Sequence, residues 1–237
     1  MGKRTGSRRR GSSPRYRAPS HRYKAKVRHI KKSEAQGVVS TLFHDPGHTA
    51  PIAKVKLDSG EKVDMIAHES MRVGQDISVG VNVPLKAGNS LPIGNIPEGT
   101  TIYNVENRPR DGGKFARSGG TNALVVSHGE KTVIQLPSRR FVPLDNHCMA
   151  TIGLVAGGGQ PVKMVAKAGR MSNYLRSKAR RYPKVSGTAM NPVDHPHGGG
   201  AHQHVGKPTT VSRHSRPGRK VGSFAAKRTG KRTGKRS

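Results

Sequence analysis

The sequence has almost no acidic side chains outside its middle. Residues 33–162 contain 12 Lys and Arg against 12 Asp and Glu, whereas the two flanks contain 32 Lys and Arg and one acid, Asp194. The flanks cannot neutralise their own charge, and self-repulsion is expected to keep them extended in free solution. The net charge of +31 therefore lies in the flanks and predicts a polyanionic partner.

Aromatic residues and cysteine are also scarce. Aromatics make up 4% of the chain and Trp is absent, which does not favour RNA binding by repeated base stacking on exposed rings. The single cysteine, Cys148, excludes an intramolecular disulfide and fits a reducing compartment. We interpret it as a small buried hydrophobe. Contacts to phosphates and grooves remain the main predicted mode of binding.

Long apolar runs are absent as well. No stretch approaches the roughly 20 apolar residues that span a bilayer, and the N-terminal MGKRTGSRRRG lacks the apolar region of a signal peptide. Neither flank has the apolar face of an interfacial helix, so nucleic acid is favoured over an anionic membrane. These features predict a cytoplasmic protein with no membrane partner.

The middle of the chain contains short β-rich runs separated by turn residues. Four runs suggest a small closed barrel such as an OB-fold, with DSGE as a hairpin turn. They are residues 38–43, 51–57, 62–68 and 76–85. Beyond the Gly- and Pro-rich loop 86–100, the spacing of five further runs favours an SH3-like barrel. They are residues 101–105, 123–127, 132–136, 141–144 and 150–156.

The predicted fold class is mainly β, an OB-fold barrel followed by an SH3-like barrel, with long extended basic arms at both ends. The expected divisions are a basic N-terminal extension (1–36), an OB-fold RNA-binding domain (37–86), an SH3-like barrel (87–162) and a basic C-terminal extension with a His/Gly-rich loop (163–237). Residues 163–181 are expected to form one or two helical turns with Lys and Arg spread around the circumference. Such a helix has no dry face.

The densest group of chemically active side chains lies in GTAMNPVDHPHGGGAHQHVGKP, residues 187–208. Interpreted as a metal site, its four histidines are enough for zinc, but Pro196 forbids helical geometry between the first two. Interpreted as a catalytic site, Asp194 and His195 form a carboxylate and imidazole pair, yet the segment supplies no Ser or Cys nucleophile.

A loop embedded in RNA is the third interpretation, and it accounts for every feature of this segment. Gly198, Gly199 and Gly200 let the backbone approach ribose and phosphate closely and adopt positive φ. The histidines stack on bases or donate N–H to phosphate oxygens. Pro192 and Pro196 stiffen the path and reduce the entropy lost on docking. We prefer this interpretation, with no metal and no catalytic residue.

The segment RPRDGGKFARSGGTNA, residues 108–123, follows the same logic, because basic side chains alternate there with two glycine pairs. The N-terminal arm adds tyrosine and arginine side chains able to stack on unpaired bases. The candidate RNA-binding residues are Arg8, Arg9, Arg10, Arg15, Arg17, His21, Arg22, Tyr23, Lys24, Arg108, Arg110, Lys114, Arg117, Lys167, Arg170, Arg176, Arg180, Arg181, Asn191, His195, His197, Gly198, Gly199, Gly200, His202, Lys207, Arg213, Arg216, Arg219 and Lys220.

Six segments, in order and over nearly the whole chain, resemble the ribosomal protein L2 (uL2) family. They are RAPSHRYKA, LPIGNIPEGT, DGGKFARSGGTNA, ATIGLVAGGG, GTAMNPVDHPHGGG and GKPTTVSRHSRPGRKVGSFAAKRTG. The length and the terminal segments are more similar to the archaeal and eukaryotic branch than to the bacterial one. His197 is a departure, since many relatives in that branch have Phe at the corresponding position.

The resemblance implies both barrels and the threading of both extensions into large-subunit rRNA. It also implies a non-enzymatic constituent of the large ribosomal subunit, a monomer within the cytoplasmic ribosome, that binds 23S-type rRNA. It further implies support of subunit assembly, subunit association, tRNA binding and peptide-bond formation. His195 matches a histidine discussed in the family as a participant in peptidyl transfer, and it becomes a candidate structural contact near that centre.

The implied partners are large-subunit rRNA, neighbouring ribosomal proteins and, across the subunit interface, small-subunit rRNA. No cofactor is expected, and Mg²⁺ is expected only through bound RNA. Two other hypotheses remain open on the residues alone. One is a histidine-ligated metalloenzyme centred on residues 195–204, and the other is a general chromatin or RNA compaction protein.

Overall fold

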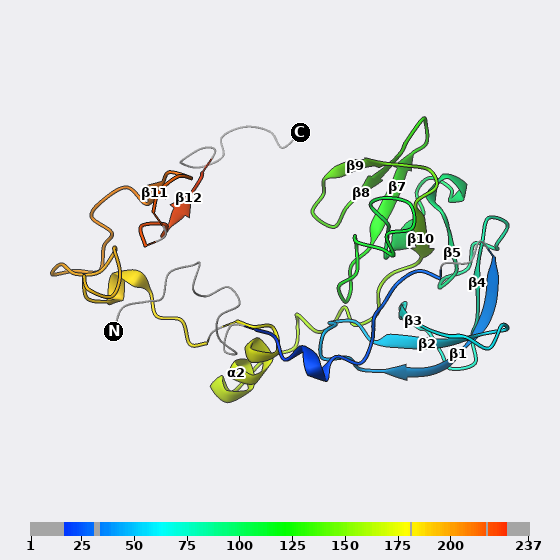
Figure 1. The fold of residues 1–237 in the computed structure, drawn as a ribbon, viewed down its shortest axis with the longest axis horizontal. Coiled ribbons are helices and arrows are strands. Elements are labelled where there is room, and N and C mark those ends of the chain that lie inside the picture. Colours follow the sequence, from blue (N-terminus) through cyan, green and yellow to red (C-terminus); the bar gives the residue numbers. More distant parts are fainter. Residues whose placement is uncertain (1–16, 31–33, 181, 217, 227–237) are drawn as a thin grey trace. The chain divides into compact units, whose positions relative to one another are not determined.

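The computed structural model describes residues 17–30, 34–180, 182–216 and 218–226. The described residues divide into two units, one within residues 21–164 and one made up of residues 17–20 and the described residues from 165 onward, and each is described by itself below (Figure 1). Five candidate RNA-binding residues lie outside the described part. They are Arg8, Arg9, Arg10, Arg15 and Arg181.

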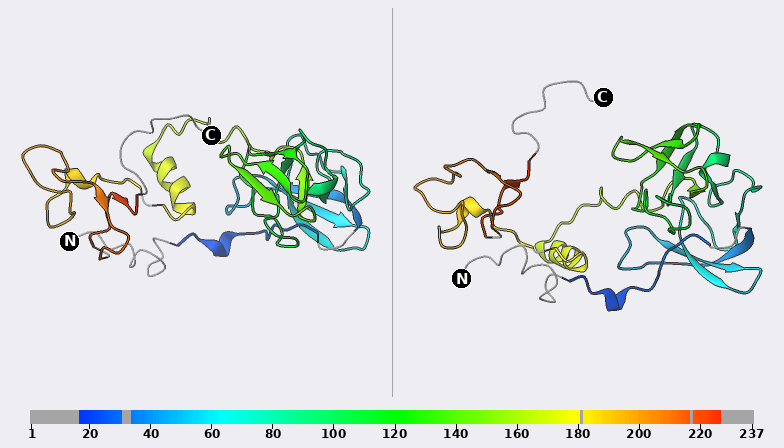
Figure 2. Two further views of the ribbon diagram at one scale, coloured as in Figure 1. Left: turned by 90° about the horizontal axis from the view of Figure 1, so that it is seen from above. Right: turned by 45° about the horizontal axis from the view of Figure 1, so that its top comes forward.

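One sheet of ten strands forms the framework of the unit 21–164. In chain order the strands are β1 (Ala35–Phe43), β2 (Ile52–Leu57), β3 (Lys62–Ile66), β4 (Asp76–Val79), β5 (Ser90–Pro92), β6 (Thr101–Tyr103), β7 (Ala123–Ser127), β8 (Thr132–Gln135), β9 (Phe141–Leu144) and β10 (Met149–Ile152). Their order across the sheet is β3-β2-β1-β4-β5-β10-β6-β7-β8-β9. The right-hand view of Figure 2 shows β1–β3 (blue to cyan) and β7–β9 (green) as two separate groups. The prediction of a mainly β fold is confirmed.

The first group of strands follows the predicted alternation closely. In β2 the side chains of Ile52, Val55 and Leu57 are buried, while Lys56 is exposed and Lys54 half-buried. The DSGE turn closes the β2–β3 hairpin, with the N–H of Leu57 donating to the carbonyl of Glu61 at 2.9 Å. Strand β1 is long enough to pair with both β2 and β4, which lets the sheet curl around its own core.

The sequence analysis missed the element that joins the two groups. The predicted loop 86–100 contains β5 and the short 3₁₀-helix η3 (Ile93–Asn95). Strand β5 pairs in parallel with β4 at Val79–Ser90 and antiparallel with β10. Three residues bounded by Gly and Pro carry too little pattern to distinguish a strand from a loop. Strand β10 also ends earlier than expected, at Ile152.

Three clusters of buried side chains make up the core of this unit. One belongs to β5–β10 and contains the fully buried Cys148, which confirms its interpretation as a core residue, and burial raises the pKa of its thiol to about 11. The second lies within β1–β4. The third joins them through the fully buried Tyr103 of β6, whose hydroxyl donates to the carbonyl of Ile66 in β3 at 3.1 Å.

Residues 24–30, named the strap below, pack against this core although the sequence analysis assigned them to an extended arm. Val27 joins the cluster around Tyr103, and Ile30 joins the cluster of β1–β4. The short 3₁₀-helix η2 (Ser20–Arg22) precedes the strap. Lys24, Lys26 and Arg28 are exposed while the positions between them turn inward, so the strap has the period of two that is typical of an extended segment on a core.

The second unit has little regular structure in its described residues. Its elements are α2 (Ala168–Ser177), the 3₁₀-helix η4 (Gly187–Ala189) and the two-stranded parallel pair β11 (Thr210–Val211) and β12 (Ser223–Phe224). Helix α2 has ten residues, more than the one or two turns expected, and none of them is buried. No described residue after Val155 is buried. Among the described residues, no helix combines the length and apolarity needed to cross a membrane.

Candidate nucleic-acid interface

Most of the candidate RNA-binding residues that the structure describes are exposed. They are Arg17, His21, Arg22, Tyr23, Lys24, Arg108, Arg110, Lys114, Lys167, Arg170, Arg176, Arg180, Asn191, Gly200, His202, Lys207, Arg213, Arg216, Arg219 and Lys220. The remaining five, Arg117, His195, His197, Gly198 and Gly199, are half-buried. Exposed Lys and Arg can reach phosphate oxygens without a change of fold, whereas the half-buried residues are partly used by the protein itself.

A buried carboxylate shapes the segment 108–123 of the first unit, named the basic loop below. Glu106 is 1% exposed, and its Oε2 accepts the N–H of Arg110 at 2.9 Å and of Met149 at 3.0 Å. Its Oε1 accepts the N–H of Gly112 at 2.8 Å. Three hydrogen bonds from backbone donors compensate for burying the charge. The sequence analysis missed Glu106, because one acid inside a basic region carries no periodic signal.

Asp111 completes this loop in the same way. Its Oδ2 accepts the N–H groups of Asn107 at 3.1 Å and Arg108 at 3.3 Å, and its Oδ1 accepts the N–H of Gly113 at 3.0 Å. Gly113 has a φ of +92°, and a Cβ there would lie 2.2 Å from the Oδ1 of Asn104. The predicted glycine pair therefore serves the folding of the loop, and the loop presents its basic side chains outward.

Arg117 ties the strap to this loop. Its Nη1 donates to the carbonyl of Gly113 at 2.6 Å, and its Nη2 donates to the carbonyl of Val27 at 2.9 Å. Burial lowers the pKa of this guanidinium, although Asp111 opposes the shift. Binding of a phosphate by Arg117 stays a prediction. In the structure, its guanidinium holds the strap against the basic loop.

Asp45 holds the other end of the strap. It is fully buried, and its Oδ1 accepts the N–H of Lys24 at 2.6 Å. Its Oδ2 accepts the Nδ1–H of His48 at 2.5 Å and the N–H of Gly47 at 3.2 Å. Burial by itself raises the pKa of Asp45, but the hydrogen bonds from Lys24 and His48 outweigh it and hold the pKa below its usual value.

His29 anchors the strap closer to its C-terminal end than Lys24 and Val27 do. Its side chain is 6% exposed, and its Nε2–H donates to the carbonyl of Asn104 at 2.5 Å. Its Nδ1 and the Oδ1 of Asn104 have no hydrogen-bond partner among the described residues. Burial lowers the pKa of His29, because the charged imidazolium loses its hydration there.

The His/Gly-rich loop of the second unit is organised by its own backbone. The Nδ1 of His195 accepts the N–H of His197 at 3.0 Å, and the two rings meet edge to face with centroids 5.0 Å apart. A Cβ at Gly187 would lie 2.3 Å from the His195 ring, and one at Gly198 would lie 2.4 Å from the carbonyl oxygen of Asn191. These two glycines are thus required by packing within the chain, a reason that the sequence analysis did not give.

The expected positive φ is confirmed at Gly199 and Gly200, with values of +88° and +90°, whereas Gly198 has no positive φ. In the described residues, no group of three or more His, Cys, Asp or Glu side chains is arranged to hold a metal ion. A separate cavity of about 470 Å³ in this unit brings together three of the predicted residues, His197, Lys207 and Arg219. Its lining contains donors suited to phosphate oxygens and two prolines.

Fold and surface together define a class: a basic nucleic-acid-binding protein whose β unit carries an arginine-rich loop and whose second unit exposes most of the cations that the structure describes there. Comparison with known proteins is more specific. Residues 2–79 match the family described as Ribosomal Proteins L2, RNA binding N-terminal domain, and residues 86–217 match Ribosomal Proteins L2, C-terminal domain.

Relatives named Large ribosomal subunit protein uL2 match along the full length. The proteins of Methanothermobacter thermautotrophicus and Methanothrix thermoacetophila are each 51% identical to this chain, over 98% of it and 100% of the relative. The protein of Methanobrevibacter smithii is 49% identical, over 97% of this chain and 99% of its own. The chain belongs to the ribosomal protein L2 family and is a ribosomal protein rather than an enzyme.

Membership also agrees with the predicted order of an OB-fold barrel and an SH3-like barrel. The match to the N-terminal family domain ends at residue 79, and the match to the C-terminal family domain begins at residue 86. The finer domain limits and the individual RNA contacts are untested and stay predictions.

Proposed function

We propose that this protein is a structural constituent of the large ribosomal subunit in the cytoplasm. In this proposal it binds large-subunit rRNA as a primary assembly protein and supports subunit association, tRNA binding and peptide-bond formation without being the catalyst. The naming of its full-length relatives as large ribosomal subunit proteins supports the location. Neighbouring ribosomal proteins and small-subunit rRNA are further partners, and Mg²⁺ enters only through the bound RNA.

The observation that carries the proposal is the pairing of charge with exposure in the second unit. Residues 163–237 contain 19 Lys and Arg and one Asp, and no described residue after Val155 is buried. A segment of this kind lacks the buried apolar surface that offsets the entropy of ordering a chain. Phosphates of RNA supply the missing stabilisation, because each docked Lys or Arg releases condensed counterions.

His195 has a structural role in this proposal. Its Nδ1 accepts a backbone N–H and its ring packs against Gly187, which fixes the turn that presents residues 195–200. The exposed His202 and Lys207 and the half-buried His197 are then the side chains of the loop that contact RNA. The proposal assigns no proton transfer to any of them.

The proposal is tested by the salt dependence of binding of the full chain to large-subunit rRNA, combined with footprinting. Ten phosphate contacts give a log-log slope of about −7 to −9. A slope shallower than about −3 contradicts the proposal, and binding without a defined footprint favours a general compaction protein. Stoichiometric zinc in RNA-free protein, lost on changing His195 and His197, would instead support the metalloenzyme.

A further inference from the structure

We propose that a pocket beneath the strap receives a single unpaired nucleotide of RNA. This inference rests on the proposed function and names one way in which the first unit recognises its RNA. The pocket has a volume of about 340 Å³ and lies wholly within the unit 21–164. Ligand pockets span roughly 300 to 1,000 Å³, so this one suits a small ligand and not a helix.

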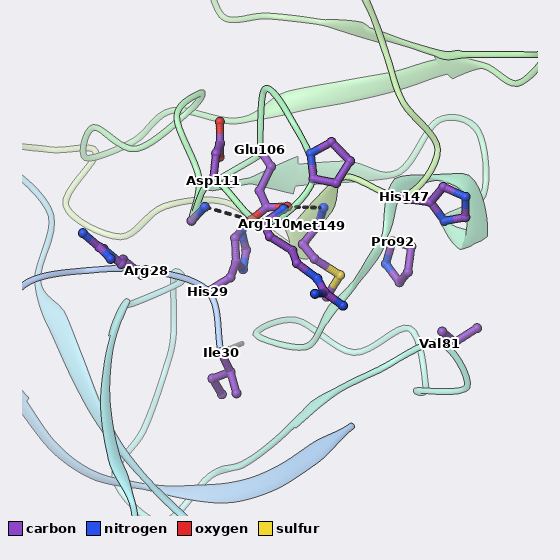
Figure 3. A pocket seen from close by; sticks show the side chains of 12 residues that line it. Arg28, His29, Ile30, Val81, Pro92, Glu106, Arg110, Asp111, His147 and Met149 are labelled. Atoms are coloured by element: carbon purple, nitrogen blue, oxygen red, sulfur yellow. Dashed lines mark hydrogen bonds between the residues drawn. The ribbon is translucent and has the colours of Figure 1, made fainter. Parts of the chain in front are cut away.

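Several parts of the unit supply the walls. The strap contributes Arg28, His29 and Ile30, the β4–β5 connection contributes Val81, and the basic loop contributes Arg110. Pro92, Pro109, His147 and Met149 complete most of the lining. Figure 3 shows Arg28, His29 and Ile30 in the left half of the view and Val81, Pro92 and His147 in the right half, with Arg110 beside Met149 between the two groups.

The apolar part of the lining suits the face of a base. Ile30, Val81, Pro92, Pro109 and Met149 present aliphatic, ring and thioether surface, and Val81 is 48% exposed. Splayed bases of single-stranded RNA are bound by stacking and apolar contact in such slots. The ring of the exposed His147 adds a stacking surface at the edge.

The charged part of the lining suits a phosphate. Arg28 and Arg110 are both exposed, and the backbone of Arg110 is held at a φ of +65° by its hydrogen bond to Glu106. The stem of Arg28 lies over Gly112, where a Cβ would be 3.2 Å from its Cγ. Both guanidinium groups are therefore carried by positions that the fold fixes, and a guanidinium matches phosphate oxygens in a bidentate manner.

Two carboxylates also line the pocket, and they do not cancel this preference. Glu106 is 1% exposed, and its two oxygens accept three backbone N–H groups, which offset its negative charge. Asp111 is half-buried and likewise accepts three. Among the charged side chains that line the pocket, the two arginines are exposed.

A side chain of a neighbouring protein is the competing occupant. It would use the apolar walls but would leave two arginines without an anion, whereas a nucleotide engages both parts of the lining at once. His29 adds a polar group, since it lines the pocket, is 6% exposed and has an Nδ1 without a partner among the described residues.

The test measures binding of the full chain to RNA hairpins that differ by one nucleotide. Four hairpins carry a single bulged A, C, G or U, and a fifth is fully paired. Val81→Trp fills the pocket without changing charge, and Val73→Trp, at a position 61% exposed and outside the pocket, is its matched control. Arg110→Gln removes one cation, with Arg140→Gln as the control for loss of charge. Thermal melting verifies that each variant is folded.

Stacking on a bound base gives roughly a 5- to 150-fold preference, and we expect the wild type to prefer at least one bulged hairpin over the paired one by this factor. Val81→Trp and Arg110→Gln reduce the ratio towards one, while both controls keep it. No preference in the wild type, or an unchanged ratio in Val81→Trp, overturns the inference. The inference is also overturned if Val81→Trp keeps the wild-type ratio of bulged to paired binding but no longer retains a neighbouring ribosomal protein in assembled particles. That result would assign the pocket to a protein side chain.

Failure of the proposed function has a different signature. Weak binding of all five hairpins with little salt dependence argues against RNA binding as such. Equal, steeply salt-dependent binding of all five leaves the proposed function intact and removes only the nucleotide pocket.

Discussion

The two units of this protein obtain a defined conformation by different means. In the described chain every buried hydrophobic residue lies between Val27 and Val155, and the buried acids of that region are satisfied by backbone donors. In the second unit Val193 is 87% exposed and Phe224 is 60% exposed. Apolar burial therefore stabilises the first unit internally, whereas in the proposed function bound RNA stabilises the second.

The strap combines features of both units. Its cationic residues face outward as in the basic flanks, while Val27 and Ile30 belong to the core. Asp45, Arg117 and His29 fix its backbone at three points. A basic segment can therefore belong to the folded unit and also expose candidate RNA-binding side chains, which net charge alone does not reveal.

Deleting residues 163–237 is expected to have the largest effect on RNA binding and assembly. We expect the β unit to remain folded, because all described buried residues stay, and we expect stable incorporation into the large subunit to be abolished. Loss of several phosphate contacts lowers affinity for large-subunit rRNA by about a hundredfold or more at moderate salt. Far-ultraviolet circular dichroism and sedimentation of assembled particles measure the two outcomes. Normal incorporation of the truncated chain would refute this division between the units.

A matched pair of substitutions makes a sharper comparison at single residues. Val27→Asp buries an unpaired carboxyl group in the cluster around Tyr103 and should lower the free energy of unfolding by about 3 kcal/mol or more. Val193→Asp, at an exposed position, should change it by less than about 0.5 kcal/mol. Urea unfolding of the RNA-free chain measures both. Similar losses for the two variants would show that the second unit has an apolar core after all.

Many strands of the β unit could be predicted from the sequence, because buried and exposed side chains alternate along them. The β2–β3 hairpin and strands β6–β9 lie within the predicted runs, since period-two burial is a local pattern. Strand β5 and the strap escaped notice for a shared reason. Each is short and pairs or packs with residues distant in the chain, such as Thr151 for β5 and Tyr103 for the strap.

The cations of the candidate site could be predicted from the sequence, but the interactions that shape its loops could not. Exposed cations in basic loops follow from charge, and most of the predicted ones are exposed. Glu106 and Asp111 shape the basic loop, but an acid that accepts backbone N–H groups leaves no mark on composition. Gly187 and Gly198 were assigned to a loop open to RNA, whereas their lack of a Cβ is already required by His195 and Asn191.

The smallest expected effect is on the pH dependence of the unfolding free energy. It concerns a buried histidine of the first unit, with an exposed histidine of the second unit as the control. Burial lowers the pKa of His29 below the value of about 6.5 that it has in an unfolded chain. Above that pH both states are neutral at this residue and its full contribution to stability is present. As the pH falls through 6.5 the unfolded chain binds a proton that the folded chain does not, so stability declines until the folded pKa is reached.

The decline is at most about 1.4 kcal/mol per pH unit for one such group. We therefore expect the wild type to lose more unfolding free energy between pH 7 and pH 5.5 than His29→Gln, which has no titrating group at that position. His202→Gln is the control, because His202 is exposed, and it should follow the wild type. Urea unfolding at a series of pH values gives the difference directly, and other histidines cancel in it. Parallel curves for the wild type and His29→Gln would mean that water reaches His29. The core stabilised by apolar burial would then begin nearer to β1 and would not include this part of the strap.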